Sequence, residues 1–514
     1  MTSPPTNLHF VLFPLMAQGH LIPMVDMARL LAQHGSIVTI ITTPINANRF
    51  KSTINRAIKA NLRIQVLELQ LPLAEVGLPE GCESFDLLPK AAQAMNMFTA
   101  MAMLENPAEK LLHDLSPPPN CIISDGGFPW TMDIATRFNI PRLVFYGPGC
   151  FAFLCIHIVT RCNILDKIES NSEYFVMPGL PDRIEVTKPQ ATTWGMGDSK
   201  ETTDNFVRMQ EAEKNSFGIV VNSFEELEPK YVKEFAKVKD KKVWCVGPVS
   251  LCNESLQDRA ERGNKAAINE HDCLKWLDSR DPQTVVYVCL GSLSYASTEQ
   301  AIELALGLEL SNIPFIWFVR NTSEELEKWV LEEGFRERIK DRGLMVQGWA
   351  PQILILSHKA IGGFVTHCGW NSTLEGISAG MPMVTWPHFG DQFLNERFIV
   401  DVLKIGVKIG VEDPVVYFEQ DKAEKLLLRR EEIKEVVEVL MDIEKEGQER
   451  RNRARKLGEL ATRAMGEGGS SHLNMTLMIQ AITEEVAKKC KPIQEVLHYV
   501  INYRCASAIS RALR

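Results

Sequence analysis

The chain has 514 residues, enough for two or three domains of ordinary size and too many for a small disulfide-stabilised scaffold. It carries 65 acidic residues against 56 lysines and arginines, a formal net charge of −9. This excess of acidic residues argues against a nucleic-acid-binding protein, which usually presents a basic face. The apolar fraction of 45% and the charged fraction of 24% are typical of soluble globular proteins.

The sequence lacks the usual signals of secretion, membrane insertion and metal binding. Its polar start is followed by a short apolar run over 9–16 without a basic flank or cleavage site, so we expect no signal peptide. No run approaches the ~18 apolar residues of a transmembrane helix. The twelve cysteines include no Cys-x-x-Cys pair and no zinc-type spacing with histidine. We therefore expect a cytoplasmic protein with free thiols, no transmembrane segment and no metal site.

Short apolar runs alternate with helical patterns in the first third of the chain. Pro23 is expected to open the first helix and Gly35 to end it as a left-handed cap. The expected elements are a strand at 9–15, the helix from Pro23, a strand at 37–43, a helix at 46–60, strands at 62–69 and 121–124, a helix from Pro129 and a strand at 142–146. This alternation predicts a parallel sheet covered on both faces.

A polar, weakly periodic segment over 249–272 is interpreted as an interdomain linker, after which the alternation resumes. Strands are expected at 284–290, 314–319, 344–347, 363–366 and 382–386, with helices at 298–310 and 372–379. Beyond residue 419, mixed charges at helical spacing predict solvated helices. The fold class is therefore α/β, with two doubly wound domains and a cleft between them, where ligands bind beyond the carboxyl ends of the strands.

Two residues that follow predicted strands can form an acid–base pair. His20 comes after the first strand, and Asp125 comes directly after the strand at 121–124. An aspartate that orients and charges a neighbouring histidine makes the other ring nitrogen a competent base near pH 7. A surface histidine and an ordinary helix N-cap are the alternatives, and the sequence does not show that the two side chains touch.

The stretch 362–375 combines a strand, a glycine turn and a helix start. Free N–H groups and the positive end of the helix dipole favour an anion at such a turn. His367, Asn371 and Ser372 add side-chain donors. A plain N-capped helix is the alternative.

Two other enzyme classes fit poorly. Gly376-Ile377-Ser378-Ala379-Gly380 matches the Gly-x-Ser-x-Gly pattern of hydrolases, but Ser378 is expected to end a helix instead of joining a strand to a helix. No Gly-x-Gly-x-x-Gly turn follows either opening strand, as a dinucleotide oxidoreductase requires, and no Walker A pattern is present.

The segment from Trp349-Ala350-Pro351-Gln352 through His367-Cys368-Gly369-Trp370-Asn371-Ser372 to Asp391-Gln392 resembles the plant secondary product glycosyltransferase signature. The opening Phe13-Pro14-Leu15-Met16-Ala17-Gln18-Gly19-His20 and the turn Leu290-Gly291-Ser292 extend the resemblance to plant family 1 UDP-glycosyltransferases over nearly the whole chain. The subgroup that glucosylates flavonoids and triterpenoid sapogenins is the most similar.

The resemblance implies a GT-B fold of two Rossmann-like domains. It implies an acceptor-binding domain at 1–248, a linker at 249–272, a UDP-sugar-binding domain at 273–460, C-terminal helices at 461–490 and a tail without an assigned role at 491–514. His20 would be the general base and Asp125 its partner. The donor contacts implied are Trp349, Ala350 and Gln352 for the uracil, Glu375 for the ribose, Ser292, His367, Asn371 and Ser372 for the phosphates, and Trp370, Asp391 and Gln392 for the sugar.

The resemblance further implies an inverting, UDP-glucose-dependent O-glucosyltransferase acting on a small hydrophobic plant metabolite, without metal or cofactor. In this family, Gln392 goes with glucose instead of galactose, and Trp370 stands where glucuronosyl enzymes tend to carry arginine. A C-glycosyltransferase and a catalytically silent UDP-sugar-binding protein of the same fold are the alternatives. We expect a monomer.

Apolar side chains are expected to form the walls of the acceptor pocket. The expected walls are residues 87–98, Phe128, residues 145–151, residues 184–195, His388 and Phe389. His388 departs from the leucine that the subgroup often carries, so it is a candidate determinant of acceptor preference.

Overall fold

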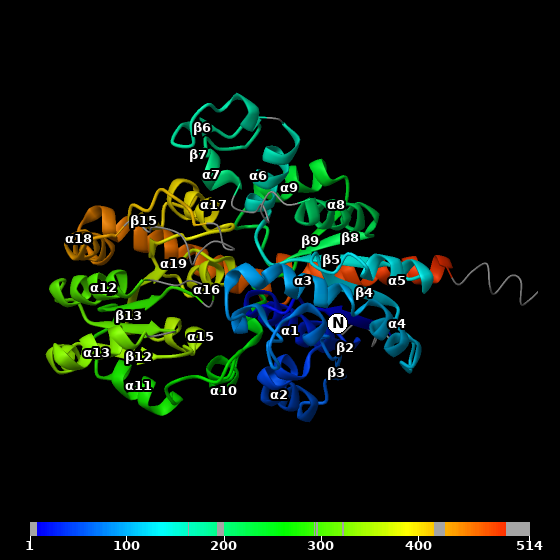
Figure 1. Ribbon diagram of the computed structural model, residues 1–514, viewed down its shortest axis with the longest axis horizontal. Helices are drawn as coiled ribbons and strands as arrows, with labels where there is room; N and C mark the ends of the chain where they lie inside the picture. The colour runs from blue at the N-terminus through cyan, green and yellow to red at the C-terminus, as the bar shows by residue number, and fades with distance from the viewer. Residues whose placement is uncertain are drawn as a thin grey trace, which may run out of the picture.

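The computed structural model describes residues 8–162, 164–192, 200–291, 293, 297–320, 323–415 and 427–489. These residues form two α/β halves that lie side by side (Figure 1). The blue-to-green N-terminal half occupies one side of the molecule and the green-to-orange C-terminal half the other. The doubly wound α/β class predicted for both halves is confirmed.

The N-terminal half is built on a parallel sheet whose strand order among the described residues is β3-β2-β1-β4-β5-β8-β9. The strands are β1 (His9–Phe13), β2 (Ile37–Thr42), β3 (Ile64–Glu68), β4 (Cys121–Asp125), β5 (Arg142–Tyr146), β8 (Gly218–Val221) and β9 (Lys242–Cys245). All five residues of β1 are buried, as expected for a parallel sheet with both faces covered.

Helices cover this sheet and extend beyond it. They are α1 (Gln18–Gln33), α2 (Pro44–Lys59), α3 (Ala94–Ala102), α4 (Glu105–His113), α5 (Thr131–Arg137), α6 (Cys150–Arg161), α7 (Lys188–Thr192), α8 (Lys200–Asn215) and α9 (Pro229–Lys239). A small antiparallel hairpin of β6 (Tyr174–Val176) and β7 (Glu185–Thr187) stands apart from the main sheet.

The C-terminal half has a second parallel sheet, in the order β12-β11-β10-β13-β14-β15 within the described ranges. Its strands are β10 (Val285–Cys289), β11 (Phe315–Val319), β12 (Gly343–Gln347), β13 (Ile361–Thr366), β14 (Met383–Thr385) and β15 (Gly406–Lys408). Its helices are α11 (Glu270–Asp278), α12 (Thr298–Leu310), α13 (Glu324–Glu332), α14 (Phe335–Ile339), α15 (Gln352–Leu356), α16 (Trp370–Ser378), α17 (Gln392–Arg397), α18 (Arg430–Met441) and α19 (Lys445–Met465).

Both sheets reverse their strand order at one point, between β1 and β4 in the first and between β10 and β13 in the second. In doubly wound folds, ligands bind beyond the carboxyl ends of the strands at this switch point. His20 follows β1, Asp125 is the last residue of β4, and the chain that follows β13 carries residues 367–375. Strand topology thus brings the predicted catalytic and donor-binding segments to the facing edges of the two sheets.

Two segments join the halves. The short helix α10 (Leu256–Ala260) lies in the stretch between the two sheets. The helix at 470–489 returns across the N-terminal half, where it is drawn in red (Figure 1). Its Met475, Met478 and Ile482 share a hydrophobic core with Phe10 of β1 and Leu143 of β5.

Some element starts differ from the predictions. Helix α1 begins at Gln18, so Pro23 lies inside it and His20 in its first turn instead of in a loop. Helix α16 begins at Trp370, two residues earlier than predicted. Neither helix has a capping side chain, because the residues before them, Ala17 and Gly369, offer no side-chain hydrogen-bonding group.

The tail at 491–514 lies outside the described residues. In the described part of the chain, every helix is too short or too polar to cross a membrane.

The packing of the helix at 470–489 on the N-terminal half can be tested by mutation. Met478 is fully buried, whereas its neighbour Leu477 is 52% exposed. We predict that Met478→Ala lowers the free energy of unfolding by about 2–5 kcal/mol, since it leaves a cavity in a shared core. The Leu477→Ala control is expected to cost under about 0.5 kcal/mol. Urea unfolding curves measure both, and equal losses in the two variants would contradict docking of this helix on the N-terminal half.

Candidate active site

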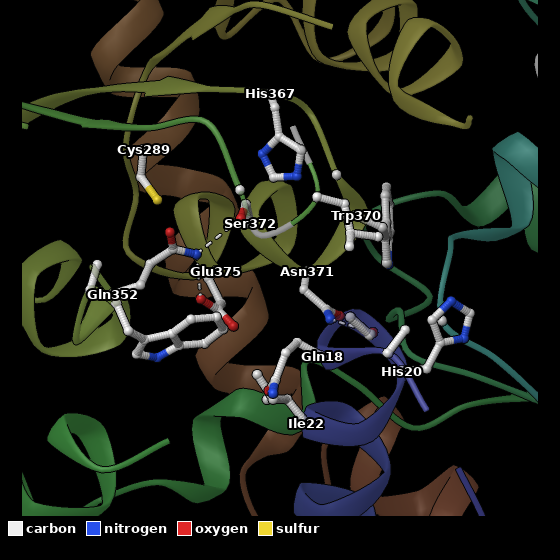
Figure 2. Close-up of a pocket in the computed structure, with 18 of the residues that line it drawn as sticks. Gln18, His20, Ile22, Cys289, Gln352, His367, Trp370, Asn371, Ser372 and Glu375 are labelled. Carbon is white, nitrogen blue, oxygen red and sulfur yellow. Dashed lines mark hydrogen bonds between the residues drawn. The ribbon is translucent and has the colours of Figure 1, made fainter. Parts of the chain in front are cut away.

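A pocket with a cavity of about 280 Å³ lies between the two halves. All the predicted site residues line it except Asp125, which lies behind His20, and Ser292, which lies outside the described residues. Figure 2 shows His20 at one end of the pocket and Gln352 at the opposite end, with Asn371 and Ser372 between them. The structure therefore brings the predicted base and the predicted donor contacts into one site.

His20 and Asp125 form a direct pair. The Nδ1 atom of His20 lies 2.6 Å from Oδ2 of Asp125. The His20 side chain is 35% exposed, whereas that of Asp125 is only 7% exposed. With Nδ1–H donating to the carboxylate, Nε2 is left as the basic nitrogen. Asp125 is the last residue of β4 and does not cap α5, so the N-cap alternative is wrong.

The Asp125 carboxylate is itself held in place. Its Oδ1 accepts a hydrogen bond of 2.9 Å from the backbone N–H of Gly127. A β-carbon at Gly127 would come within 2.5 Å of Leu15 Cδ1, so any larger residue there would have to displace the Leu15 side chain. The turn after β4 thereby holds Oδ1, while His20 binds Oδ2.

The surroundings shift the acid–base behaviour of the pair and of Asp391. Partial burial lowers the pKa of His20, but the negative charges of Asp125 and Asp391 and the bond to Asp125 raise it above 6.5 overall. Burial raises the pKa of Asp391 to about 6, although its hydrogen bond to Asn395 opposes this shift. Asp391 comes from the C-terminal half, so both halves influence the imidazole.

The turn between β13 and α16 is tightly built. Cys368 has a φ of 63°, which is unfavourable for a residue other than glycine. Its carbonyl accepts a hydrogen bond of 2.8 Å from Asn395 Nδ2, which stabilises the turn. The His367 ring fits between Gly291 and Gly369, since a β-carbon on either would come within 2.4 Å of Nε2.

His367 is neutral at pH 7, because burial lowers its pKa to about 4. Its Nδ1 is buried and has no hydrogen-bond partner among the described residues. The ring stands beside the first turn of α16, whose free N–H groups favour an anion. A neutral imidazole there can donate a hydrogen bond to a phosphate.

Two predicted donor contacts reach across to the N-terminal half. The indole Nε1 of Trp370 donates to the Asn222 carbonyl at 2.7 Å, and Trp370 is only 4% exposed. Asn371 Nδ2 donates to the Gly19 carbonyl at 2.6 Å. Proline at position 23 has no N–H for the Gly19 carbonyl, which therefore accepts from Asn371 instead. Both side chains therefore donate these hydrogen bonds to the N-terminal half, and these bonds join the two halves.

The predicted nucleoside contacts form a hydrogen-bonded chain. Gln352 Nε2 donates to Ser372 Oγ at 3.0 Å and to Glu375 Oε2 at 2.8 Å, as dashed lines mark in Figure 2. The hydroxyl of Tyr287 donates to Gln352 Oε1 at 3.1 Å. This chain orients the Glu375 carboxylate at the pocket wall.

Several pocket residues were not predicted from the sequence, among them Arg259 and Arg262 in the polar segment interpreted as a linker. Arg262 Nη1 donates to Glu375 Oε1, and the Arg262 carbonyl accepts from Trp349 Nε1 at 3.1 Å. Nothing in the local pattern marks these arginines, since the segment is rich in charged residues throughout. Arg320, another pocket residue that was missed, pairs with the buried Asp86 of the N-terminal half at 3.0 Å.

Gln392, the predicted sugar contact at the start of α17, has one end of its amide fixed. Its Oε1 accepts from the backbone N–H groups of His388 at 2.8 Å and Phe389 at 3.2 Å. Its Nε2 makes no hydrogen bond to the described residues. Because Gln392 lines the pocket, this N–H₂ group is available to a ligand.

Part of the predicted acceptor wall is wrong. Phe128, Phe145 and Phe151 are at most 1% exposed and belong to the hydrophobic cores, so they do not face an open cavity. Their apolar character reflects packing in these cores. Residues 193–195 of the predicted wall lie outside the described residues.

The described residues show neither a placed serine nucleophile nor a group of metal-ligating side chains. Ser378 ends α16 and donates its hydroxyl to the Leu374 carbonyl at 2.7 Å, so it is not placed as a nucleophile. Within the described ranges, no three histidine, cysteine, aspartate or glutamate side chains are grouped to hold a metal ion.

Two family models match the chain. The model described as "Glycosyltransferase, N-terminal domain" matches residues 6–251. The model described as "UDP-glucoronosyl and UDP-glucosyl transferase" matches residues 263–446. Together they cover both halves and both walls of the pocket.

Known proteins resemble the chain over nearly its full length. UDP-glycosyltransferase 73E1 of Stevia rebaudiana is 61% identical over 489 residues, which are 95% of this chain and 98% of that relative. The structure of Glycyrrhiza uralensis UGT73P12 with glycyrrhetinic acid 3-O-monoglucuronide has a TM-score of 0.88 and 34% identity, covering 97% of this chain and 100% of that one. Phytolacca americana UGT2, complexed with UDP-2fluoro-glucose and pterostilbene, has a TM-score of 0.73 and 26% identity, covering 93% and 100%.

The pairing of His20 with Asp125 leads to a prediction about the pKa of the imidazole. We predict that Asp125→Asn lowers the pKa of His20, because the variant removes the main negative charge that stabilises the imidazolium. Titration of the ring-proton NMR signals, with the His20 signal assigned from a His20→Gln variant, measures this pKa. Asp133→Asn, which changes an exposed carboxylate on α5, is the control and is expected to leave it unchanged. A His20 pKa unaffected by Asp125→Asn would contradict the pairing.

Proposed function

The chain belongs to the plant family 1 UDP-glycosyltransferases and has their GT-B fold, and from this premise we propose that it is an inverting UDP-glucose-dependent O-glucosyltransferase. The acceptor is a hydroxyl of a small hydrophobic plant metabolite, a triterpenoid sapogenin or a flavonoid. The observation that carries the proposal is the pairing of His20 with Asp125, with His20 lining the same pocket as the first turn of α16.

His20 acts as the general base in this proposal. Its Nε2 takes the proton of the acceptor hydroxyl while the acceptor oxygen bonds to the anomeric carbon of glucose. Asp125 accepts the Nδ1–H bond throughout and stabilises the imidazolium that forms. Because the base acts when neutral, its raised pKa places the acid limb of the rate profile above pH 6.5.

The leaving group is UDP, whose bond to the anomeric carbon breaks as the acceptor bond forms. Negative charge then builds on the departing phosphate. The N-terminal turn of α16 and the neutral His367 supply hydrogen-bond donors for this charge. Attack from the face opposite UDP inverts the α-linked donor to a β-glucoside. The proposal includes no metal ion, since the helix terminus stabilises the departing phosphate.

Glucose is proposed as the sugar because of Gln392. With Oε1 held by two backbone N–H groups, the amide presents Nε2 toward the pocket as a donor for a sugar hydroxyl. Asp391 adds an acceptor one residue earlier. The complex of Phytolacca americana UGT2 with UDP-2fluoro-glucose supports a glucosyl donor for a relative of this chain.

The proposed acceptor class rests on the ligands of related structures. The complexes of relatives with glycyrrhetinic acid 3-O-monoglucuronide and with pterostilbene agree with a small hydrophobic acceptor. His388 stays a candidate determinant of the choice among acceptors.

An acceptor panel with UDP-glucose tests the proposal. Flavonoids, triterpenoid sapogenins, simple phenols and cytokinins are incubated with the protein, with UDP-galactose as the control donor and EDTA in a parallel series. We expect a product one hexose heavier than one acceptor class, labile to acid, formed faster from UDP-glucose and unaffected by EDTA. An acid-stable product would instead indicate C-transfer, and UDP binding without any product would indicate a silent binding protein.

His20→Ala is the matched variant. It is expected to lower kcat by about 10²–10⁴-fold, because it removes proton transfer, and to leave the Kd for UDP within about twofold of the wild-type value. Isothermal titration with UDP and initial-rate kinetics measure the two effects. Unchanged turnover would contradict the assignment of His20 as the base.

A further inference from the structure

Arg262 bridges two carboxylates from different halves of the molecule. Its Nε and Nη2 lie 2.8 and 2.7 Å from Oδ2 of Asp26 on α1, and its Nη1 donates to Oε1 of Glu375 on α16. The side chains of Arg262, Asp26 and Glu375 are 11%, 2% and 6% exposed. A planar guanidinium has donors on several edges and can hold two carboxylates in fixed directions at once.

The electrostatics of this bridge depend on the arginine charge. Burial lowers the pKa of Arg262, but the two carboxylates outweigh burial and raise it well above its ordinary value. Removing the guanidinium would leave two buried carboxylates without their shared cation, which is costly in a poorly hydrated environment. Arg262 therefore holds the two acidic side chains in their observed places.

The backbone beside Arg262 is fitted closely between the halves. Gly263 has a φ of 86°, and a β-carbon there would come within 2.9 Å of both Ile22 Cδ1 and Trp349 Cζ2. The carbonyl of Arg262 accepts from Trp349 Nε1 at 3.1 Å. The guanidinium is thus placed by the chain path itself and is not a mobile surface side chain.

The two helices that Arg262 connects carry the two parts of the proposed site. Asp26 follows His20 by six residues on α1, about 9 Å along the helix axis, and Glu375 follows Ser372 by three residues on α16. At the other end of the same helix pair, Asn371 Nδ2 donates to the Gly19 carbonyl. The helices are therefore fastened at two points.

We propose that Arg262 is a positioning residue for glycosyl transfer. By donating to Oε1 while Gln352 donates to Oε2, it fixes the plane of the Glu375 carboxylate and leaves its other lone pairs directed to the ribose hydroxyls of the UDP-sugar. Through Asp26 it also keeps α1, and with it His20, in register with the donor. This inference rests on the proposed function, in which His20 is the base, and on the ribose contact that the family resemblance implies for Glu375.

The test compares Arg262→Gln with Arg56→Gln in the full-length protein. Arg56, on α2, pairs with Asp258 and Glu261 of the same segment but contacts neither Glu375 nor Asp26, so it controls for a general loosening of the segment. Arg262→Gln is expected to weaken UDP binding about tenfold or more and to raise KM for UDP-glucose, leaving KM for the acceptor unchanged. Arg262→Lys, which keeps the charge but not the fork, is expected to recover part of the loss. Arg56→Gln is expected to stay within about twofold of wild type in the Kd for UDP.

Asp26→Asn separates the orientation of Glu375 from the anchoring of α1. It also tests the proposal if Arg262→Gln fails to fold. It removes the anchor on α1 but keeps the Arg262–Glu375 pair, so we expect kcat to fall while the Kd for UDP is retained. Equal losses of UDP affinity in the Arg262 and Arg56 variants, or a kcat unchanged by Asp26→Asn, would overturn the proposal. If wild-type protein binds UDP but glucosylates no acceptor, the proposed function fails. The dissociation constants for UDP of the Arg262 and Arg56 variants, measured by calorimetry, still decide the role of Arg262 in UDP binding.

Discussion

The contact between helices α1 and α16 is the constraint on which the rest of the site depends. A proline inside α1 frees the carbonyl of Gly19, and Asn371 of the opposite half donates to that carbonyl at 2.6 Å. His20 is the next residue after Gly19, so the same helical turn carries the interdomain bond and the imidazole. The position of His20, the proposed base, is therefore set by contact with α16, the helix proposed to bind the donor phosphates.

Ion pairs reinforce this contact, and the surroundings shift the pKa values of the two pocket histidines in opposite directions. Arg262 and Arg320 each tie a carboxylate of the N-terminal half to the C-terminal half. Around the pocket, the pKa of His20 is raised by neighbouring carboxylates and that of His367 is lowered by burial. His20 can thus accept and hold a proton, whereas His367 stays neutral beside the first turn of α16. The difference comes from the number of carboxylates near each ring.

The sequence predicted most of the fold because long buried runs and good caps leave few alternatives. The strand at 142–146 and the helix at 298–310 have the predicted bounds, and Ser297 caps that helix by accepting from the Gln300 N–H. The start of α1 was missed because Ala17 has no capping group, while proline is common at a first helical position. In the site, the residues of the family motif were predicted from the sequence. The direction of the Trp370 indole and the bridge by Arg262 were not, because both depend on how the two halves pack, and the spacing of residues along the chain carries no information on that packing.

The central claim is that a base on one half and UDP on the other act on opposite faces of the sugar. The anomeric configuration of the product tests this geometry most directly, by the proton NMR coupling between H1 and H2 of the transferred glucose. The account predicts the large coupling of a β-glucoside, formed with inversion from the α-linked donor. A product with the small coupling of an α-glucoside would contradict it, since retention requires the acceptor to arrive on the face that UDP leaves.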